Sequence, residues 1–442
     1  MVAWAHQAEV IPKLLAGNFL LIWDAGAGKT LPLLQAASQR DGRTLYLGPP
    51  AIRTQVSKEA QIFGCYDVKD IQVVQYGKDK VAPQAKLVIC SYDHLIDPKL
   101  WKQLFTLEWD TLILDEGHLL KNTAAKRTRA VYGSRRDSPG ALIRRTKRVW
   151  VATGTPIVND PSDFWPHVSR LLPHVLEDLQ ISKKDQWVDK FCHVRQTPYG
   201  PVVTGGKNLE ELRTVLAPYV SRAKKENILD LPPLHVTQLW VPARDIDLDG
   251  VPPEALQELE RLLDNNQTER LGELMAPLAT LRRRIGILKA AHCADIVRTE
   301  IESGGGKTIL FYHHKDVGEA LVEQLRHQYI FFKGGVAHYT GGMAQAKRDA
   351  VVKQFTGDKN CRVLVAQIMA AGTGLNLQAA ERVIIVEPAW TPASNEQAIA
   401  RAYRAGQKKK VWASFVCLEN SIDERITSAL IRKQRIIDGA IG

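Results

Sequence analysis

Short apolar runs alternate with longer amphipathic stretches over the first 160 residues of the chain. Each run predicts a buried strand, and the stretches between the runs are long enough for helices. Strands that are apolar throughout are typical of a parallel sheet that is covered on both faces. The predicted strands are Phe19–Trp23, Thr44–Leu47, Leu87–Cys90, Thr111–Leu114 and Arg148–Ala152.

A second series of apolar runs begins near residue 308, and the segment between the two series has a different pattern. Residues 162–220 and 254–300 carry few strand-like runs and several helical ones, with proline pairs at 232–233 and 252–253. We therefore expect an α/β fold with two parallel-sheet domains and helical segments inserted between and within them. The strands of the second series are Thr308–Tyr312, Arg362–Ala366, Arg382–Val386 and Trp412–Leu418.

The composition is that of a soluble globular chain with a basic balance. Hydrophobic residues make up 45% of the 442 positions, and no apolar run is long enough to span a bilayer. Six cysteines without a C-x-x-C pair argue against a structural zinc site or a disulfide framework. Lys and Arg number 59 against 48 Asp and Glu, a net charge of +11, which predicts an anionic partner such as nucleic acid.

A glycine-rich segment that suits phosphate binding directly follows the first predicted strand. A strict Walker A motif would need glycine at position 23, where this chain has Trp23. The physical parts are nevertheless present, since the glycines let backbone N–H groups approach phosphate oxygens and a helix follows. The alternative is an ordinary strand-to-helix turn. The expected phosphate contacts are Gly26, Ala27, Gly28, Lys29 and Thr30, with the Thr30 hydroxyl also on Mg²⁺.

Two further motifs follow predicted strands. Asp115 and Glu116 end the strand Thr111–Leu114, and two carboxylates there suit Mg²⁺ binding by Asp115 and activation of a water by Glu116. The tetrapeptide DEGH, residues 115–118, is by itself weak evidence for a nucleotide site, since acidic residues are common on protein surfaces. Thr153, Gly154 and Thr155 follow the next strand, where they form either a plain turn or a sensor of the nucleotide state.

Other candidates lie near the two ends of the chain. A glutamine amide can pair with an adenine edge, although His6-Gln7 alone means little. Arg401 and Arg404, spaced i and i+3, predict two guanidinium groups on one helical face, which suits a γ-phosphate, although a solvated basic face fits too.

In order, the chain carries His-Gln, GAGKT, DEGH, TGTP-x-x-N, Gly-Thr-Gly-Leu-Asn and Q-A-x-x-R-x-x-R-x-G-Q. This set closely resembles the Swi/Snf-type ATPases of helicase superfamily two, over essentially the whole chain. Residues 288–291 leading to 309–314 look most like the annealing-helicase, fork-remodelling branch.

The resemblance implies two RecA-like domains with ATP and Mg²⁺ in the cleft between them. Lys29 and Thr30 would hold the phosphates and the metal, Asp115 the metal, and Glu116 the water. Arg401 and Arg404 would act as arginine fingers from the second domain. His118, Thr153, Gly154 and Thr155 would couple nucleotide state to movement. Residues expected to bind the cofactor are His6, Gln7, Gly26, Ala27, Gly28, Lys29, Thr30, Gly374, Gln397, Arg401 and Arg404.

The resemblance also implies a division of the chain and a set of DNA contacts. The expected segments are an ATP-binding domain at 1–160, a helical protrusion with a return to that domain at 161–230, a connector with a second protrusion at 231–303, and the second domain with a C-terminal helix at 304–442. Loops at strand ends can donate backbone N–H groups to phosphates. The expected DNA contacts from the resemblance are Pro49, Pro50, Ser91, Tyr92, His313 and Gly341.

The leading hypothesis is a DNA-stimulated ATPase that moves on double-stranded or branched DNA and remodels DNA or protein–DNA structures. A strand-separating, branch-migrating or annealing helicase is the second, and an RNA-directed ATPase is also possible. A further hypothesis, from another class of function, is a nucleotide-gated DNA clamp with little ATP turnover. We expect a minimal, monomeric bacterial or phage enzyme in the cytoplasm, with nuclear location less favoured.

The basic charge is concentrated in one segment. Residues 121–148 hold ten basic residues and one acidic residue, between DEGH and TGTP. The segment is either a solvated basic loop and helix or a DNA-phosphate contact, and the second reading predicts strongly salt-dependent binding. The residues taken as contacts are Lys121, Arg135, Arg136, Arg144 and Arg145.

Overall fold

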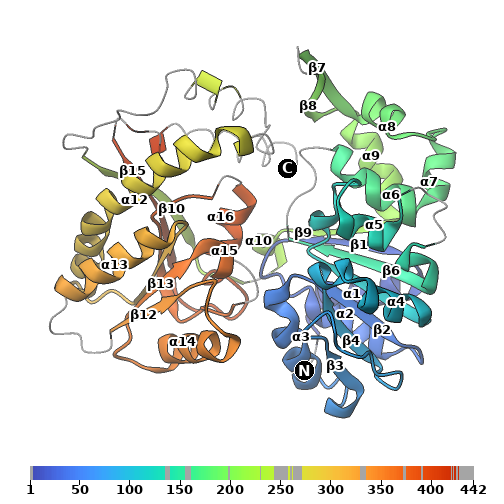
Figure 1. The fold of residues 1–442 in the computed structure, drawn as a ribbon, viewed down its shortest axis with the longest axis horizontal. Helices are drawn as coiled ribbons and strands as arrows, with labels where there is room; N and C mark the ends of the chain where they lie inside the picture. The colour runs from blue at the N-terminus through green and yellow to red at the C-terminus, as the bar shows by residue number, and fades with distance from the viewer. Residues whose placement is uncertain are drawn as a thin grey trace. The chain divides into compact units, whose positions relative to one another are not determined.

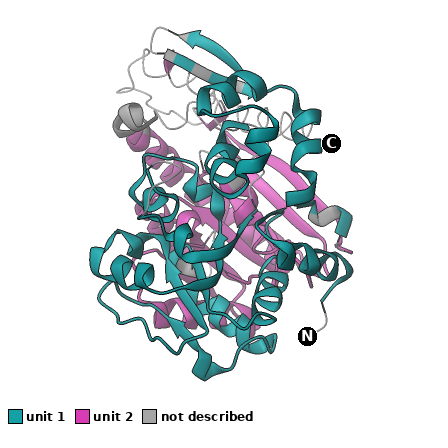
Figure 2. Ribbon diagram, turned by 90° about the vertical axis from the view of Figure 1, so that its right-hand side faces the viewer, with its two compact units in different colours: residues 1–229 teal, residues 230–442 magenta. Residues whose placement is uncertain are grey.

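The chain divides into two compact units, Met1–Leu229 and Asp230–Gly442, each built around its own sheet. Figure 1 shows the elements coloured along the chain, and Figure 2 distinguishes the two units. The computed structural model describes residues 3–134, 140–154, 161–197, 200–228, 230–242, 257–258, 261, 271–328, 335–371, 375–389, 392–419, 421, 423–424 and 427.

The sheet of the first unit has seven described strands, all parallel, in the order β3-β4-β2-β5-β6-β1-β9. Because the strands are parallel, their carboxyl ends share one edge of the sheet, where loops of α/β proteins bind ligands. The strands are β1 Phe19–Trp23, β2 Thr44–Gly48, β3 Ile71–Val73, β4 Leu87–Ser91, β5 Trp109–Asp115, β6 Thr146–Thr153 and β9 Val220–Ala223.

Helices cover both faces of this sheet, because successive strand residues point to opposite sides. Leu21 of β1 packs in the same cluster as Leu33 of α2, whereas Leu20 packs in the cluster that holds Leu100 of α4. Apolar residues are therefore needed at every position of β1, which explains its continuous apolar run. The helices are α1 Ala5–Ala16, α2 Thr30–Ser38, α3 Arg53–Ile62, α4 Pro98–Thr106 and α5 Lys126–Tyr132.

Between β6 and β9 the chain forms a largely helical insert. Its helices pack against the sheet of this unit, with Val168 and Trp187 buried in the same cluster as Leu20. The hairpin of β7 and β8 within this insert is antiparallel and was not expected from the sequence. The insert comprises α6 Trp165–Leu171, α7 Pro173–Asp178, α8 Lys184–Phe191, β7 Cys192–Thr197, β8 Gly200–Gly206 and α9 Leu209–Leu216, and α10 Lys225–Ile228 follows β9.

The second unit is also built on a parallel sheet, whose six described strands have the order β10-β15-β14-β11-β13-β12. The strands are β10 Leu234–Val241, β11 Lys307–Tyr312, β12 Val336–Tyr339, β13 Val363–Gln367, β14 Ala380–Ile385 and β15 Val411–Leu418. The helices are α12 Leu271–Glu302, α13 Lys315–Gln328, α14 Gln345–Gly357, α15 Ile368–Ala371 and α16 Pro392–Ile399.

The long helix α12 packs directly on this second sheet. Ile285 and Val297 of α12 belong to the same buried cluster as Leu310 and Ile384 of the strands. Lys289 of the helix is fully buried and forms an ion pair with Asp423. A buried cation of this kind is tolerated only when it is fully paired. The segment expected to hold a connector and a protrusion thus contributes a strand and a helix to the core of the second unit.

Two parallel α/β sheets with helical inserts confirm the predicted fold class. The finer division into four segments stays a prediction. All nine strands predicted from apolar runs are present, with ends that differ by up to two residues. None of the helices that the structure describes is long and apolar enough to cross a membrane.

Candidate functional site

The phosphate-binding segment lies at the carboxyl end of β1 and leads straight into α2. Gly26 and Gly28 have φ angles of 87° and 80°, in the left-handed region that glycine adopts without strain. The Lys29 ammonium donates to the carbonyls of Trp23 at 2.9 Å and Asp24 at 3.1 Å. The lysine is thus held at the end of the strand, next to the first turn of α2, where a phosphate is favoured.

Trp23, the departure from the Walker A pattern, is accommodated by packing. Its side chain is 1% exposed, and its indole N–H donates to the Ser221 hydroxyl of β9 at 3.0 Å. Its ring centroid lies 4.9 Å from that of His6 on α1. The bulky residue therefore points into the core and leaves the loop that follows unobstructed.

His6 and Gln7 contact the backbone of the phosphate-binding segment. The Gln7 amide donates to the Gly28 carbonyl at 2.8 Å and accepts from the Trp4 N–H at 2.8 Å. A His6 ring nitrogen lies 3.2 Å from the Ala27 carbonyl oxygen. Both residues brace the segment from α1, and their role in adenine recognition stays a prediction.

Asp115 is held at the end of β5 by three hydrogen bonds that involve its side chain or carbonyl. The Tyr46 hydroxyl donates to Oδ2 at 2.7 Å, the Glu116 N–H donates to Oδ1 at 2.9 Å, and the Tyr92 hydroxyl donates to the carbonyl at 2.8 Å. Burial raises the pKa of Asp115 to about 6, and Glu116 adds to the rise, while Lys29 opposes it. Neither tyrosine was singled out for this role from the sequence.

The raised pKa of Asp115 predicts that replacing this carboxylate with a neutral side chain stabilises the folded protein. The folded state binds this proton more tightly than the unfolded state, so its contribution to the free energy of unfolding falls between pH 4 and 6 and stays reduced above that. At pH 7.5, without nucleotide or Mg²⁺, we expect Asp115→Asn to stabilise the protein by about 1–2 kcal/mol. The full shift corresponds to more, but Asp115 as a whole residue is only partly buried.

Thermal denaturation at pH 7.5 and pH 4 tests this expectation. The midpoint of the variant should be higher at pH 7.5, and the difference should vanish at pH 4. An equal or lower midpoint at pH 7.5 would contradict the assigned pKa shift.

Glu116 adopts a left-handed backbone conformation that is uncommon for a residue with a side chain, with φ 51° and ψ 48°. Such conformations cost free energy and concentrate at functional sites. The Glu116 carboxylate lies 3.3 Å from Nδ1 of His118, which lies 3.1 Å from the Thr153 hydroxyl. His118 thus bridges the carboxylate and the start of the TGTP segment.

Gly154 brings the TGTP segment against the phosphate-binding segment. A Cβ placed at Gly154 would lie 3.1 Å from both the Lys29 ammonium nitrogen and the Ala25 amide nitrogen. This close approach explains the glycine, and it completes a continuous path from Lys29 through Thr153 and His118 to Glu116. Thr155 lies outside the described residues.

A buried histidine packs against Gly117, the residue between Glu116 and His118. His167 of α6 is fully buried beneath Gly117, and its Nδ1 lies 2.8 Å from the Tyr132 hydroxyl. Burial lowers the pKa of His167 to about 4, and His118 adds to the shift. The histidine is therefore neutral at physiological pH, and sequence reasoning gave no signal for it.

In the second unit, the two candidate arginines do not lie on one helical face as expected. Helix α16, which carries Gln397, ends at Ile399, and the chain continues in i→i+3 turns. Arg401 donates from Nε to the Gln397 carbonyl at 3.0 Å, and Arg404 donates to the Leu375 carbonyl at 3.3 Å. The two arginines therefore lie in the turns that follow α16. Gly374 lies outside the described residues.

Gln407 fixes these turns to the loop before β14, a role that the sequence motif did not reveal. Its buried amide donates to the carbonyls of Gln378, Ala380 and Ala402 at 3.0–3.1 Å. The Arg401 carbonyl accepts from Leu377 N–H at 3.0 Å. The glutamine of the R-x-x-R-x-G-Q ending is thus a structural link.

The candidate DNA contacts of the first unit lie at the same edge as the phosphate-binding segment. Pro49 and Pro50 follow β2, and Ser91 and Tyr92 stand at the end of β4. Ser91 and Tyr92 are 0% and 1% exposed over the whole residue, so neither presents a surface to a partner in this structure. Their contact with DNA stays a prediction.

In the second unit, Gln367 joins the two candidate loops. Its amide accepts from the Gly341 N–H at 2.9 Å and donates to the His313 carbonyl at 3.2 Å. Burial lowers the pKa of His313. The ends of β11, β12 and β13 are thereby linked.

The basic segment is partly neutralised by acidic residues outside it. Arg145 pairs with Glu108 at 2.7 Å, Arg148 with Asp110 at 2.9 Å, and Lys121 with Asp163 at 3.3 Å. Arg144 and Arg145 precede β6, at the sheet edge opposite the phosphate-binding segment. The ion pair with Glu108 favours, for Arg145, the alternative of a solvated basic loop over a DNA-phosphate contact. DNA contact by this segment stays a prediction. Arg135 and Arg136 lie outside the described residues.

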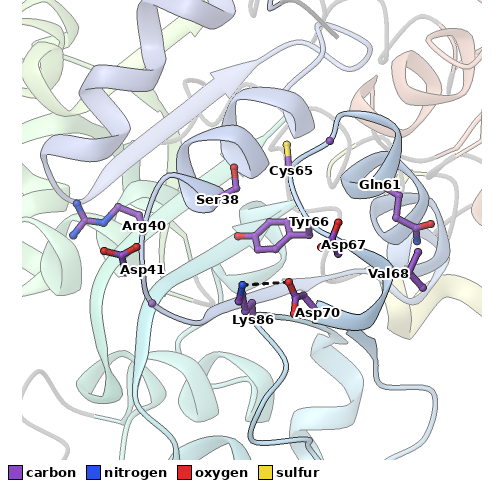
Figure 3. A pocket seen from close by; sticks show the side chains of 12 residues that line it. Ser38, Arg40, Asp41, Gln61, Cys65, Tyr66, Asp67, Val68, Asp70 and Lys86 are labelled. Carbon is purple, nitrogen blue, oxygen red and sulfur yellow. Dashed lines mark ion pairs between the residues drawn. The ribbon is translucent and has the colours of Figure 1, made fainter.

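A cavity of about 540 Å³ lies at this opposite, amino edge of the first sheet (Figure 3). Side chains of both signs line it, among them Arg40, Asp41, Asp67 and the ion pair of Lys86 with Asp70 at 3.3 Å. It lacks the glycines and the lysine of the phosphate-binding segment, and we do not assign it to nucleotide.

Two models of known protein domains match this chain. A model of the SNF2-related domain matches residues 46–248, and a model of the helicase conserved C-terminal domain matches residues 289–406. The chain belongs to the SNF2 family. The predicted resemblance to Swi/Snf-type helicase proteins is thereby confirmed.

Two relatives of this SNF2-family chain are named for work on DNA or chromatin. The "DNA annealing helicase and endonuclease ZRANB3" of Mus musculus is 24% identical over 440 residues, covering 95% of this chain and 39% of that protein. The "SWI/SNF-related matrix-associated actin-dependent regulator of chromatin subfamily A-like protein 1" of Xenopus tropicalis is 24% identical over 429 residues, covering 96% and 43%. The chain thus spans about two fifths of these relatives.

Among solved structures, the Sulfolobus solfataricus SWI2/SNF2 ATPase core in complex with dsDNA is 21% identical. The match covers 99% of this chain and 92% of the Sulfolobus chain, with a TM-score of 0.45.

Proposed function

We propose that this SNF2-family chain is an ATP-hydrolysing motor that translocates on double-stranded DNA and remodels DNA or protein–DNA structures. The observation that carries the proposal is the path from Lys29 through Gly154, Thr153 and His118 to Glu116. It joins Lys29, Thr153 and the Asp115–Glu116 pair in one network at one edge of the sheet, which supports roles in phosphate binding, sensing and water activation.

The residues fit ATP with Mg²⁺. Oxygen donors are the ligands that Mg²⁺ prefers, and the Thr30 hydroxyl and the Asp115 carboxylate supply them. The chemistry that Mg²⁺ supplies is neutralisation of charge on the β and γ phosphates. Lys29 binds the same phosphates, and Glu116 orients the attacking water and accepts its proton. Tyr46 and the Glu116 N–H keep Asp115 oriented.

Arg401 and Arg404 of the second unit would complete the site by contacting the γ-phosphate. Two guanidinium groups there stabilise charge that builds up in the transition state. Support comes from the turns that carry them, in which the Leu377 N–H donates to the Arg401 carbonyl and the Gln407 N–H donates to the Arg404 carbonyl. Release of the γ-phosphate would then be sensed by Thr153 and His118.

The DNA partner is proposed from the relatives' names and from the carboxyl-edge loops of both units. Double-stranded or branched DNA is the proposed form, with a monomeric enzyme in a bacterial or phage-infected cell. Whole-protein activities of the relatives, including fork remodelling and annealing, are proposals here because the chain spans only part of each relative.

Triplex displacement tests translocation without strand separation. We expect ATP-dependent release of a third strand from a plain duplex, with no release of either duplex strand. Separation of a plain duplex would favour the helicase alternative. Tight DNA binding without turnover or displacement would favour the clamp.

A further inference from the structure

The loop between β3 and β4 presents an exposed aromatic side chain at the carboxyl edge of the first sheet. Tyr76 stands three residues after β3 and is 64% exposed. The Lys78 ammonium lies 5.8 Å from the centroid of its ring. Lys80 is exposed on the same loop.

Hydrogen bonds hold the backbone of this loop in place. One Asp79 carboxylate oxygen accepts from the N–H groups of Gln75 at 2.8 Å and Tyr76 at 3.0 Å. The Gln103 amide of α4 donates to the Asp79 carbonyl at 3.1 Å and accepts from the Val81 N–H at 3.0 Å. The Tyr76 ring is therefore exposed on a loop whose backbone is held in place by hydrogen bonds.

A second set of hydrogen bonds fixes the following residues. The Gln72 amide donates to the Lys80 carbonyl at 2.7 Å and accepts from the Ala82 N–H at 2.8 Å. Lys80 and Ala82 are thus tied to β3, and ordering the Tyr76 side chain on a ligand costs little additional backbone entropy.

The loop lies beside residues that follow the two candidate DNA-contact loops of this unit. Arg53 donates from its guanidinium to the Pro50 carbonyl at 3.2 Å and to the Gln75 carbonyl at 3.2 Å, so it joins the loop after β2 to the Tyr76 loop. On the other side, a Cβ at Gly77 would lie 2.7 Å from a carboxylate oxygen of Asp97, which caps α4 after the Ser91–Tyr92 segment.

We infer that Tyr76 stacks on an unpaired base of branched or single-stranded DNA, while Lys78 contacts the adjoining phosphate. An exposed aromatic ring beside lysines is the arrangement that binds unpaired bases, since every base offers a ring face and the backbone is anionic. A plain duplex offers no such base. The inference rests on the proposed function, because it names the form of DNA that the same edge recognises.

The test compares affinities for a forked duplex with single-stranded arms and for a plain duplex of equal length, by fluorescence anisotropy. We expect Tyr76→Ala and Tyr76→Leu to lower the ratio of fork to duplex affinity by roughly tenfold, the scale of one base stacked on an aromatic ring. Tyr76→Phe, which keeps the ring, should retain the wild-type ratio. Taking the ratio within each variant cancels any loss of folded protein.

The inference fails if the ratio is unchanged in Tyr76→Ala, or if both affinities fall in parallel. It also fails if the wild-type protein binds the two DNAs equally. A wild-type protein that binds both DNAs but shows no DNA-stimulated ATP hydrolysis would instead overturn the proposed function, so the two failures are distinguishable.

Discussion

Glu116→Gln is expected to lower ATP hydrolysis by about 10³-fold or more while leaving ATP binding intact. The amide has nearly the volume of the carboxylate, so the left-handed backbone at this position and the contact with His118 can persist. What is lost is the group that accepts a proton from the attacking water. Single-turnover hydrolysis and equilibrium binding of a fluorescent ATP analogue measure the two effects separately.

Glu210→Gln is a matched control, since Glu210 is an exposed carboxylate on α9. It should leave both measurements unchanged. Turnover near the wild-type rate in Glu116→Gln would remove Glu116 from the mechanism, and loss of ATP binding would point to a structural role.

Arg404→Ala is expected to lower turnover by roughly 10³-fold, the scale of other arginine fingers. Its charge is proposed to stabilise the γ-phosphate in the transition state, so the Michaelis constant for ATP should change much less than the turnover number. Steady-state kinetics at saturating DNA provide both values.

Because Arg404 also donates to the Leu375 carbonyl, folding must be checked by thermal denaturation. Arg326→Ala, which removes an exposed arginine from α13 of the same unit, is the control and should behave as wild type. An unchanged turnover in Arg404→Ala would assign Arg404 to structure alone.

The fold was predictable where strands are apolar throughout. The bounds of β1 are those predicted from Phe19–Trp23, because both of its faces are buried. Strands β3 and β12 were missed because three or four residues carry too little pattern. Strand β10 was missed because it is an edge strand with exposed Val236 and Trp240, so burial imposes less on its sequence.

The catalytic candidates were predictable because each motif is contiguous in sequence. Lys29 and the Asp115–Glu116 pair each follow an apolar strand, and the structure brings them to one edge. Their supports were not predictable, since Tyr46 lies 69 residues from Asp115 and meets it only through pairing of β2 with β5. Gln407 and His167 were hidden for the same reason, as their partners are set by tertiary packing.

The charge of the segment 121–148 shows the limit of counting residues. The single carboxylate of Asp110 lies within 4 Å of three basic groups, those of Arg40, Lys147 and Arg148. Charge-reversal of Arg144 and Arg145 would show whether this segment adds to the salt dependence of DNA binding, as the sequence suggested.

The central claim, a motor driven by ATP and directed to duplex DNA, is tested most directly by the steady-state ATPase rate. The rate should be measured without nucleic acid and with single strands, plain duplex, forked DNA and RNA. The account predicts strong stimulation by duplex and forked DNA and little by RNA. Stimulation by RNA alone, or a rate that no nucleic acid changes, would contradict it.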